Sequence, residues 1–338
     1  MEVLPDTNRR FVLKARPLDL PAPEHFAIER LPHPPLAPGE VRVRIHHVAL
    51  SPWQGQRLKD FKNYTKPFEI GELIDCDVLG EIVETGSVAD DRFAIGTKVT
   101  GRLGWQEHAV AKPERLLAVS DVFEPTLWLT ALSSPGLTAY CAMDLFGRPM
   151  PGQTLVVTSA AGSVGGYAVQ LGKLSGMTVV GIAGGPTKTQ YVVEQLGADH
   201  CIDHRSPSFA NDLADASPDG VNLFFDTVGG PIADTVFDNL AKYAQVVIVG
   251  RTASNNSERP DLDPVNMRQL WAREASIKGF SRYSYPERWD FARQCMQRLC
   301  RQRLIRSNHT EVVGFENTPA ALRDMLSGKF IGKVLVRY

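Results

Sequence analysis

The sequence predicts an α/β protein in which a doubly wound parallel β-sheet is joined to a second, β-rich domain. From about residue 151, short apolar runs alternate with stretches of helical periodicity, which is typical of a parallel sheet wrapped by helices. Before about residue 130, apolar residues instead alternate at period two, which is typical of half-buried strands. With 338 residues, the chain is long enough for both domains.

The β-rich domain is expected at residues 1–130. Its strands are expected at residues 41–46, 78–83 and 106–110, where apolar and polar side chains alternate. The chain ends in another short strand pattern at residues 333–337. Because this strand lies beyond the parallel-sheet region, we expect a C-terminal segment, about residues 306–338, to return and complete the first domain.

The parallel-sheet domain is expected at residues 131–305. Its apolar runs have the length and composition of strands that are buried on both faces. The expected strands are residues 155–158, 178–183, 221–226 and 246–249, and the expected helices are residues 164–175, 187–196, 232–243 and 286–303. The last of these helices carries Trp289, Ala292, Met296 and Leu299 at helical spacing on one face, with its five arginines elsewhere.

Charge and composition exclude several classes of protein. The chain has 37 basic and 38 acidic residues, a net charge of −1, which argues against nucleic acid or an anionic membrane surface as the partner. No run reaches the roughly 18 apolar residues of a membrane helix, and the N-terminus lacks the pattern of a signal peptide. The five cysteines form no C-x-x-C pair. We therefore expect a cytoplasmic protein with reduced cysteines.

A small-residue turn carries the strongest chemical signal. Residues 154–158 form an apolar strand, residues 160–165 read A-A-G-S-V-G, and a helix follows. This is a variant of the G-x-G-x-x-G fingerprint, in which backbone N–H groups at a helix N-terminus bind the pyrophosphate of a dinucleotide. The expected contacts of the turn are Gly162, Ser163, Val164, Gly165 and Gly166.

The second strand of this domain predicts which dinucleotide binds. An NAD site needs an acidic residue about 20 positions beyond the glycines, to hold the ribose 2′-hydroxyl. Residues 145–193 contain no Asp or Glu, and the second strand instead runs into Gly184-Gly185-Pro186-Thr187-Lys188. We therefore expect NADPH, with Gly184 leaving room for the 2′-phosphate and Lys188 supplying its counter-charge.

The same turn is one substitution from the G-x-S-x-G nucleophile elbow of serine hydrolases. Asp226 and His309 follow Ser163 in the order that a hydrolase triad would need. The sequence before the turn, however, contains few strands of an α/β sheet and no His-Gly-Gly oxyanion segment. A serine hydrolase is the weaker alternative for this turn.

Several short motifs, spread over nearly the whole chain, carry a resemblance to a known family. They are Asn8-Arg9-Arg10, Tyr64-x-x-Pro67-Phe68, Pro135-Gly136-Leu137-Thr138-Ala139-Tyr140, the glycine turn, the Gly184 to Lys188 segment, Phe225-Asp226-Thr227-Val228-Gly229-Gly230, Gly314-Phe315-Glu316-Asn317 and Gly332-Lys333. With them, the chain resembles the zinc-independent medium-chain dehydrogenase/reductases, in the branch of 15-oxoprostaglandin 13-reductases, alkenal double-bond reductases and curcumin reductases. The resemblance implies a GroES-like N-terminal domain, a Rossmann domain, NADPH and a homodimer.

The resemblance also implies further cofactor contacts and no metal. His204 stands where the family often has a tyrosine near the adenosine phosphate. Other contacts expected along the cofactor are Thr227, Val249, Gly250, Arg251, Thr252, Asn255, Phe280, Ser281 and Arg282. Ser51 stands near the position of the first cysteine ligand in zinc-dependent relatives, and residues 100–114 hold no cysteine for a structural zinc site. We therefore expect Cys76 to be a buried apolar residue rather than a ligand.

The expected reaction is NADPH-dependent reduction of the carbon–carbon double bond of an enal or enone. Hydride addition would leave negative charge on the carbonyl oxygen, which needs a hydrogen-bond donor. Tyr64 matches the family's active-site tyrosine and is the expected donor, while Arg57 and Tyr283 are expected to shape the pocket. The alternatives are an NADPH quinone reductase and a non-catalytic NADPH-binding protein.

Overall fold

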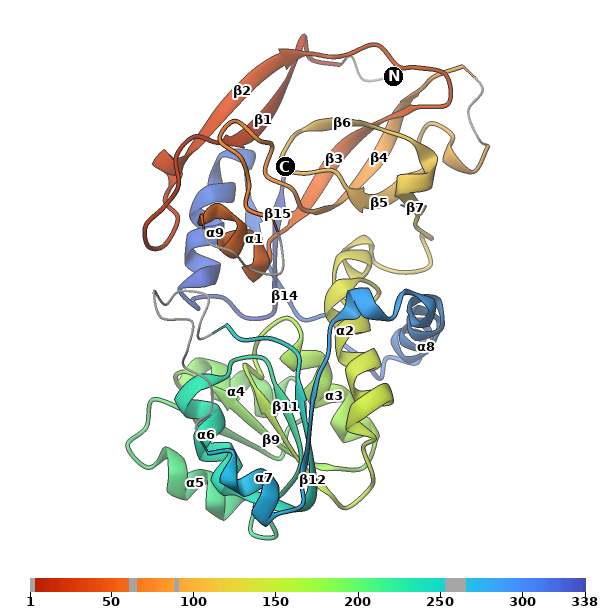
Figure 1. Ribbon diagram of the computed structural model, residues 1–338. Helices are drawn as coiled ribbons and strands as arrows, with labels where there is room; N and C mark the ends of the chain where they lie inside the picture. The colour runs from red at the N-terminus through yellow and green to blue at the C-terminus, as the bar shows by residue number, and fades with distance from the viewer. Residues whose placement is uncertain (1–3, 61–65, 88–90, 253–265) are drawn as a thin grey trace. The chain divides into compact units, whose positions relative to one another are not determined.

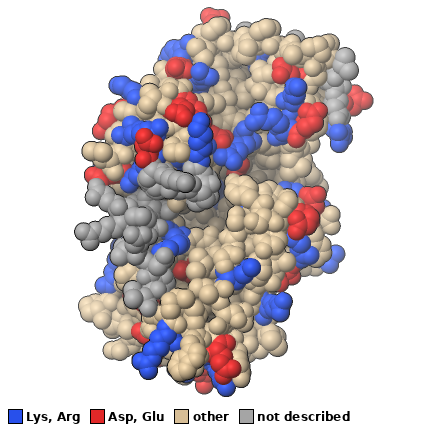
Figure 2. All heavy atoms as spheres, in the orientation of Figure 1, with Lys and Arg blue, Asp and Glu red and all other residues tan. Residues whose placement is uncertain are grey.

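The computed structural model describes residues 4–60, 66–87, 91–252 and 266–338 (Figure 1). The chain divides into two compact units. One unit comprises residues 1–129 together with residues 309–338, and the other comprises residues 130–308. Among the described residues, no helix has the length and hydrophobicity that a membrane crossing requires. Basic and acidic side chains are interspersed on the face drawn in Figure 2.

The unit at residues 130–308 contains a parallel sheet of six described strands in the order β10-β9-β8-β11-β12-β13. In chain order this is 3-2-1-4-5-6, the doubly wound Rossmann arrangement. The strand order reverses between β8 and β11, and ligands bind such sheets at this switch point, beyond the carboxyl ends of the strands. The strands are β8 (Thr154–Thr158), β9 (Thr178–Ala183), β10 (His200–Asp203), β11 (Val221–Asp226), β12 (Leu240–Ile248) and β13 (Ser276–Gly279).

Helices connect the strands of this sheet and cover its faces, as Figure 1 shows. Every residue of β8 is buried, which explains why an uninterrupted apolar run encodes this strand. The helices are α2 (Ser134–Ala142), α3 (Gly165–Leu174), α4 (Pro186–Glu194), α5 (Phe209–Ala216), α6 (Gly230–Asp238), α7 (Arg268–Ala272) and α8 (Trp289–Arg301). Of the stripe predicted in α8, Ala292 and Met296 are fully buried, whereas Trp289 and Leu299 are only partly buried.

One predicted helix is wrong in its second half. The helix expected at residues 232–243 ends with α6 at Asp238, and the chain then enters β12. Apolar side chains at positions 236, 237, 240 and 244 fit a helical period, but Leu240 pairs with Val221 in the sheet. The register then shifts, and Tyr243 adopts a left-handed φ of 64° in the irregular stretch. Pairing with β11 therefore outweighs the local helical pattern.

The other unit is built mainly from antiparallel strands, with β14 and β15 paired in parallel. β1 (Thr7–Leu13) pairs with β2 (Phe26–Pro32), and a second sheet follows the order β14-β15-β3-β4-β5-β7, with β6 paired to β3. In this sheet β15 runs antiparallel to β3, with Leu335 opposite Ala49. The strands are β3 (Val41–Ala49), β4 (Asp77–Thr85), β5 (Lys98–Arg102), β6 (His108–Ala111), β7 (Leu116–Ala118), β14 (His309–Val313) and β15 (Lys333–Arg337).

The core of this unit is aromatic and aliphatic. Trp105 is fully buried and contacts the rings of Phe11 and Phe26. Two helices, α1 (Pro52–Leu58) and α9 (Thr318–Leu326), pack against each other in the same unit. The C-terminal segment thus supplies a helix and two strands to the unit that the N-terminal residues begin.

Candidate functional site

The glycine turn links the carboxyl end of β8 to the N-terminus of α3. A Cβ atom on Gly162 would lie 2.5 Å from the Ser159 hydroxyl oxygen, and one on Gly165 would lie 2.3 Å from the Ser159 carbonyl oxygen. Both distances are far below normal contact, so the turn accepts only glycine at these positions. Ser163 and Val164 lie between them, and the backbone of the turn can therefore approach a ligand at the first turn of the helix.

Asn308 holds the glycine turn from a distant part of the chain. Its side chain is fully buried, and its Nδ2 donates a hydrogen bond of 2.8 Å to the Gly162 carbonyl oxygen. Its Oδ1 accepts a hydrogen bond of 3.0 Å from the hydroxyl of Tyr191 on α4. A Cβ atom on Gly166 would lie 2.1 Å from Asn308 Nδ2, which explains the second glycine of the pair. Sequence reasoning missed Asn308, because nothing local marks it as part of the site.

Three basic side chains meet beyond the carboxyl ends of β9 and β10. A Cβ atom on Gly184 would lie 2.9 Å from both Arg205 Nε and His204 Nε2. Gly185 has a φ of 86°, a left-handed conformation that favours glycine, and α4 with Lys188 begins directly after it. The second strand therefore ends against Lys188, His204 and Arg205, which we call the cation cluster.

The electrostatics of the cation cluster favour an anion. Burial and, secondarily, the positive charge of Arg205 lower the pKa of Lys188. Burial and Arg205 also lower the pKa of His204. Each positive charge in the cluster thus disfavours the protonated form of its neighbours. An anion bound among these side chains would relieve this repulsion. The ribose 2′-phosphate of NADPH has the charge and the expected position, so the residues present fit this cofactor.

Arg205 is a member of the cluster that sequence reasoning did not find. Arg205 follows β10 directly and so lies at the edge where parallel strands bring their carboxyl ends together, but β10 has no continuous apolar run that would mark it in the sequence. Asp203 also lies at this edge, but its carboxylate accepts the backbone N–H of Arg205 at 3.0 Å. Hydrogen bonds from the backbone amides of Arg205 and Gly185 lower the pKa of Asp203. The Asp203 carboxylate therefore stabilises the backbone of the turns at this edge.

The edge of the sheet beside β8 is organised by Asp226 at the end of β11. Its Oδ1 accepts hydrogen bonds from the Thr158 hydroxyl at 2.8 Å and from the amides of Val228 and Gly229 at 2.9 and 3.0 Å. Burial raises the pKa of this carboxyl group against the effect of these donors. Asp226 is thus used to hold the turn after β11, whereas a hydrolase would need it to orient a histidine.

Thr227 brings several predicted contacts together at the switch point. Its amide donates to the Thr158 hydroxyl at 2.8 Å, and its carbonyl oxygen accepts from the amide and hydroxyl of Thr252 at 3.1 and 3.2 Å. The amide of Val249 donates to the Asp226 carbonyl oxygen at 2.7 Å, and Gly250 follows. The structure therefore places the residues predicted from β11 and β12 beside the strand that carries the glycine turn.

The remaining predicted cofactor contacts lie farther along the sheet. Arg251 is close to the turn after β11, because a Cβ atom on Gly229 would lie 3.3 Å from Arg251 Nε. Phe280 follows β13, and its amide donates to the Ile248 carbonyl oxygen at 2.8 Å. Ser281 comes next, and the guanidinium of Arg282 lies over the ring of Trp289 at 4.8 Å. Asn255 lies outside the described residues.

The structure describes two of the three residues that were predicted to be catalytic. Tyr64 lies outside the described residues. Tyr283 is 55% exposed, and its hydroxyl accepts a hydrogen bond of 3.2 Å from Arg282. Arg57 stacks on Phe68 at 3.8 Å, and its Nε donates to the Lys66 carbonyl oxygen at 2.7 Å. Arg57 also forms ion pairs with Glu72 and Asp75, so its guanidinium is engaged within its own unit.

Cys76 and Ser51 stand near positions that hold zinc in related dehydrogenases, and in this protein each has a different environment. Cys76 is fully buried, and this burial raises the pKa of its thiol. The hydroxyl of Ser51 accepts a hydrogen bond of 2.5 Å from the ammonium group of Lys333. Within the described residues, no group of three or more His, Cys, Asp or Glu side chains is arranged to hold a metal ion.

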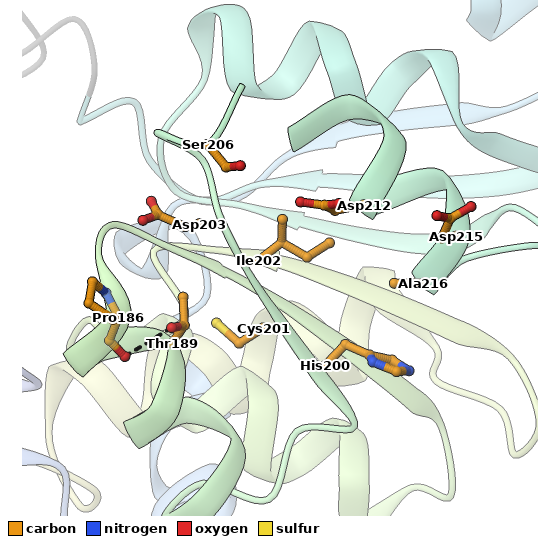
Figure 3. Close-up of a pocket in the computed structure, with 10 residues that line it drawn as sticks. All are labelled: Pro186, Thr189, His200, Cys201, Ile202, Asp203, Ser206, Asp212, Asp215 and Ala216. Carbon is orange, nitrogen blue, oxygen red and sulfur yellow. Dashed lines mark hydrogen bonds between the residues drawn. The ribbon is translucent and has the colours of Figure 1, made fainter. Parts of the chain in front are cut away.

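A cavity of about 550 Å³ lies near the cation cluster but is lined by other residues (Figure 3). Side chains from β10, α4 and α5 line it, and none of them is a predicted contact. They include Thr189, Cys201, Asp203, Asp212 and Asp215. Burial raises the pKa of the Cys201 thiol to about 12. A dinucleotide phosphate would meet carboxylates here, so this cavity does not extend the anion site.

Comparison with known proteins places the chain in a family. Residues 9–119 match the family model described as the N-terminal domain of oxidoreductase, and residues 163–298 match the one described as zinc-binding dehydrogenase. The chain is 32% identical to the NADPH-dependent curcumin reductase of Escherichia coli, over 98% of this chain and 96% of that protein. It is 29% identical to prostaglandin reductase 1 of Sus scrofa, over 97% of this chain and 98% of that protein.

A solved structure agrees with these relatives. The crystal structure of CurA in complex with NADPH, from Vibrio vulnificus, matches with a TM-score of 0.90 and 33% identity, over 97% of this chain and 98% of that chain. The predicted combination of a Rossmann sheet with a β-rich N-terminal domain is thereby confirmed. The chain is a member of the medium-chain dehydrogenase/reductase superfamily, in the branch that contains the curcumin and prostaglandin reductases.

Proposed function

We propose that this protein is an NADPH-dependent oxidoreductase that reduces the carbon–carbon double bond of α,β-unsaturated carbonyl compounds. The observation that carries the proposal is the cation cluster of Lys188, His204 and Arg205 at the end of the second strand, where an NAD site would have an acidic side chain. The similarity to a curcumin reductase and to prostaglandin reductases supports a substrate of the enone class.

The chain would hold the cofactor at three places along the sheet. The glycine turn and the N-terminus of α3 would bind the pyrophosphate, and the cation cluster would bind the 2′-phosphate. Thr227, Val249 and Thr252 would lie along the middle of the cofactor, with Phe280 towards the nicotinamide end. When bound, NADPH supplies a hydride for the β-carbon of the substrate.

The protein must also stabilise the charge that the reaction creates. Addition of hydride to the β-carbon makes the carbonyl an enolate, and a donor aimed at this oxygen lowers the barrier. Tyr64 is the proposed donor, because its phenol can stabilise the oxyanion and pass on a proton. Arg57 is proposed as a positioning residue, since its guanidinium holds Lys66 and Phe68 on one side of the segment that contains Tyr64.

The proposed assembly and compartment are a homodimer in the cytoplasm. All five cysteines are free in the structure, as a reducing compartment would keep them. The proposed partner is the small-molecule substrate, an enal, an enone or a quinone. Neither nucleic acid nor a membrane is part of the proposal, because the net charge is only −1.

A substrate panel tests this proposal. Purified protein with NADPH is offered an enal, an enone, a quinone and an ester, and consumption of NADPH is followed by its absorbance. The proposal predicts enone-dependent consumption with a saturated carbonyl compound as the product. Turnover of the quinone alone would favour a quinone reductase, and ester cleavage without NADPH would favour the hydrolase. Binding of NADPH without any turnover would indicate a non-catalytic protein.

A further inference from the structure

A second cavity, of about 360 Å³, lies entirely within the β-rich unit. It is formed where β1 and β2 meet β3 and β6, and the sequence pattern gave no reason to expect it. Its described lining residues are Asn8, Arg10, Leu31, Pro32, His33, Pro34, Arg42, Gln106, His108 and Val110. Leu31, Val110 and two prolines make part of the wall apolar, and the rest is polar.

Two imidazole rings in this wall are incompletely hydrogen-bonded. The Nε2 of His33 and the Nδ1 of His108 are buried, and neither has a hydrogen-bond partner among the described residues. The rings lie 5.1 Å apart, edge to face, and His108 is only 7% exposed. Burying a polar nitrogen without a partner is unfavourable, so a hydrogen-bond partner supplied by a ligand would stabilise the complex.

The ionisable side chains in the described lining of the cavity are all basic. Two arginines and two histidines line the cavity, and none of the described lining residues is acidic. Arg42 is 3% exposed and bonds to Glu84 at 2.6 Å and to the Pro34 carbonyl oxygen at 2.8 Å. Arg10 pairs with Glu29 at 2.8 Å. These ion pairs fix both guanidinium groups in the wall, and the two glutamates offset part of their charge without lining the cavity.

The side-chain amides of Asn8 and Gln106, which line the cavity, already form hydrogen bonds within the protein. The Nδ2 of Asn8 donates to Gln106 Oε1 at 3.0 Å and to the His108 carbonyl oxygen at 2.8 Å, and its Oδ1 accepts the His108 amide at 2.9 Å. The Nε2 of Gln106 donates to the Leu103 carbonyl oxygen at 2.6 Å. The two histidines are therefore the groups that remain for a ligand.

We propose that this cavity binds a small organic monocarboxylate with an apolar chain or ring. The carboxylate would accept hydrogen bonds from the rings of His33 and His108, and its apolar part would lie against Leu31, Pro34 and Val110. The site is separate from the glycine turn and the cation cluster, because every lining residue belongs to the β-rich unit.

Protonation of His108 makes the proposed binding depend on pH. The groups that act on this ring are His33 from the loop after β2, Arg42 and Arg44 from β3, and Glu107 before β6. Burial, and then the charge of His33, lowers the pKa of His108 to about 4. A carboxylate beside the ring would favour its protonated form and raise this pKa. Binding therefore takes up a proton, and affinity increases as the pH falls.

The test is a titration of the full-length protein with hexanoate, followed by NMR signals of the ligand and of the histidine rings. We expect saturable binding at one site, tighter at about pH 6 than at about pH 8, because binding of the carboxylate takes up a proton on His108. Hexan-1-ol, which lacks the charge, and inorganic phosphate, which lacks the apolar chain, should each bind about tenfold more weakly or not at all.

Variants locate the site. His108→Gln and His33→Gln should each weaken hexanoate binding about tenfold, the effect of one charge-assisted hydrogen bond. His200→Gln, a control at an exposed histidine of β10, should leave binding unchanged. If His108→Gln fails to fold, His33→Gln decides, because His33 lies in the loop after β2. Equal binding of hexan-1-ol, or binding that His33→Gln does not weaken, would overturn the proposal.

Discussion

In the proposed function, the side chains of the cation cluster select the cofactor. Gly184 provides space that a Cβ atom would fill, and Lys188, His204 and Arg205 surround that space with positive charge. A phosphate bound here would receive charge-assisted hydrogen bonds, each of which contributes about 1.5–3 kcal/mol. NADH carries a hydroxyl group in place of this phosphate. The difference between the two cofactors should therefore reside in these three side chains.

Removal of either strong cation should weaken NADPH binding selectively. Lys188→Ala and Arg205→Ala should each raise the NADPH dissociation constant by about 1.5–3 kcal/mol, roughly tenfold or more, with little effect on NADH. Calorimetric titration with both cofactors measures this change. Lys242→Ala, which removes an exposed lysine paired with Glu274, is the matched control. Equal losses for NADPH and NADH would show that the cluster does not bind the 2′-phosphate.

Tyr64 should affect the chemical step more than binding. Tyr64→Phe keeps the ring and removes only the donor, so NADPH should bind as it does to the parent protein. Because a donor to the enolate acts mainly in the transition state, single-turnover hydride transfer to an enone should slow about 10²–10³-fold. Stopped-flow absorbance measures this rate, with Tyr283→Phe as the comparison. An unchanged rate with every enone tested would remove Tyr64 from the proposed mechanism.

At the scale of elements, the junction of β8 and α3 depends on close backbone packing. A Cβ atom at position 165 would collide with the Ser159 carbonyl oxygen, which is backbone and cannot rotate away. Gly165→Ala should therefore destabilise the protein by about 2 kcal/mol or more and weaken dinucleotide binding, because the turn must shift.

Denaturant unfolding of two glycine variants measures this effect. At Gly279 no atom of the described residues, its own chain neighbours aside, lies within 4 Å of a Cβ position, so Gly279→Ala should change the free energy of unfolding by no more than about 0.5 kcal/mol. If Gly165→Ala were as stable as Gly279→Ala and bound NADPH normally, the close packing of this turn would not be required.

The elements also show what a single sequence can predict. Strands such as β8 and β11 were predicted to within one residue, because burial on both faces leaves a continuous apolar run. The short edge strand β10 carries His200 and Asp203 and has no such run. The error at residues 232–243 has a related cause, since the pairing of Leu240 with Val221 is a long-range contact. Local periodicity does not record such contacts.

The candidate site has a local part and a long-range part. The glycine turn and Lys188 stand in local motifs, so the sequence alone could propose them. Arg205 and Asn308 join the site only through the sheet and through side-chain contacts across 146 positions, as between Asn308 and Gly162. Their roles follow from the three-dimensional arrangement, and neither residue type marks a dinucleotide site by itself.

At the scale of the whole molecule, the exposed edge of the Rossmann sheet supports the proposed homodimer. β13 is the last strand of this sheet, and all of its residues are exposed, including Ile277. The nearby residues Trp271 and Tyr243 are 81% and 60% exposed. An open strand edge with exposed apolar side chains is a template for pairing with a second chain.

Light scattering should therefore give twice the mass of one chain. Ile277→Asp, which places a charge on the edge strand, should produce a monomer, whereas Ile95→Asp, at an exposed residue of the other unit, should leave the dimer intact. A parent protein that is monomeric at micromolar concentration would contradict the dimer. A dimer that Ile277→Asp leaves unchanged would place the interface elsewhere.

In the proposed reaction, hydride from NADPH adds to the β-carbon of an enone. This step can be followed with NADPH that carries deuterium at the transferred position of the nicotinamide ring, with mass and NMR analysis of the product. We expect a saturated ketone with one deuterium on the former β-carbon, since the proton that completes the reduction comes from the protein or from water. Deuterium on the carbonyl carbon of an unsaturated alcohol, or no deuterium in any product, would contradict the proposed reaction.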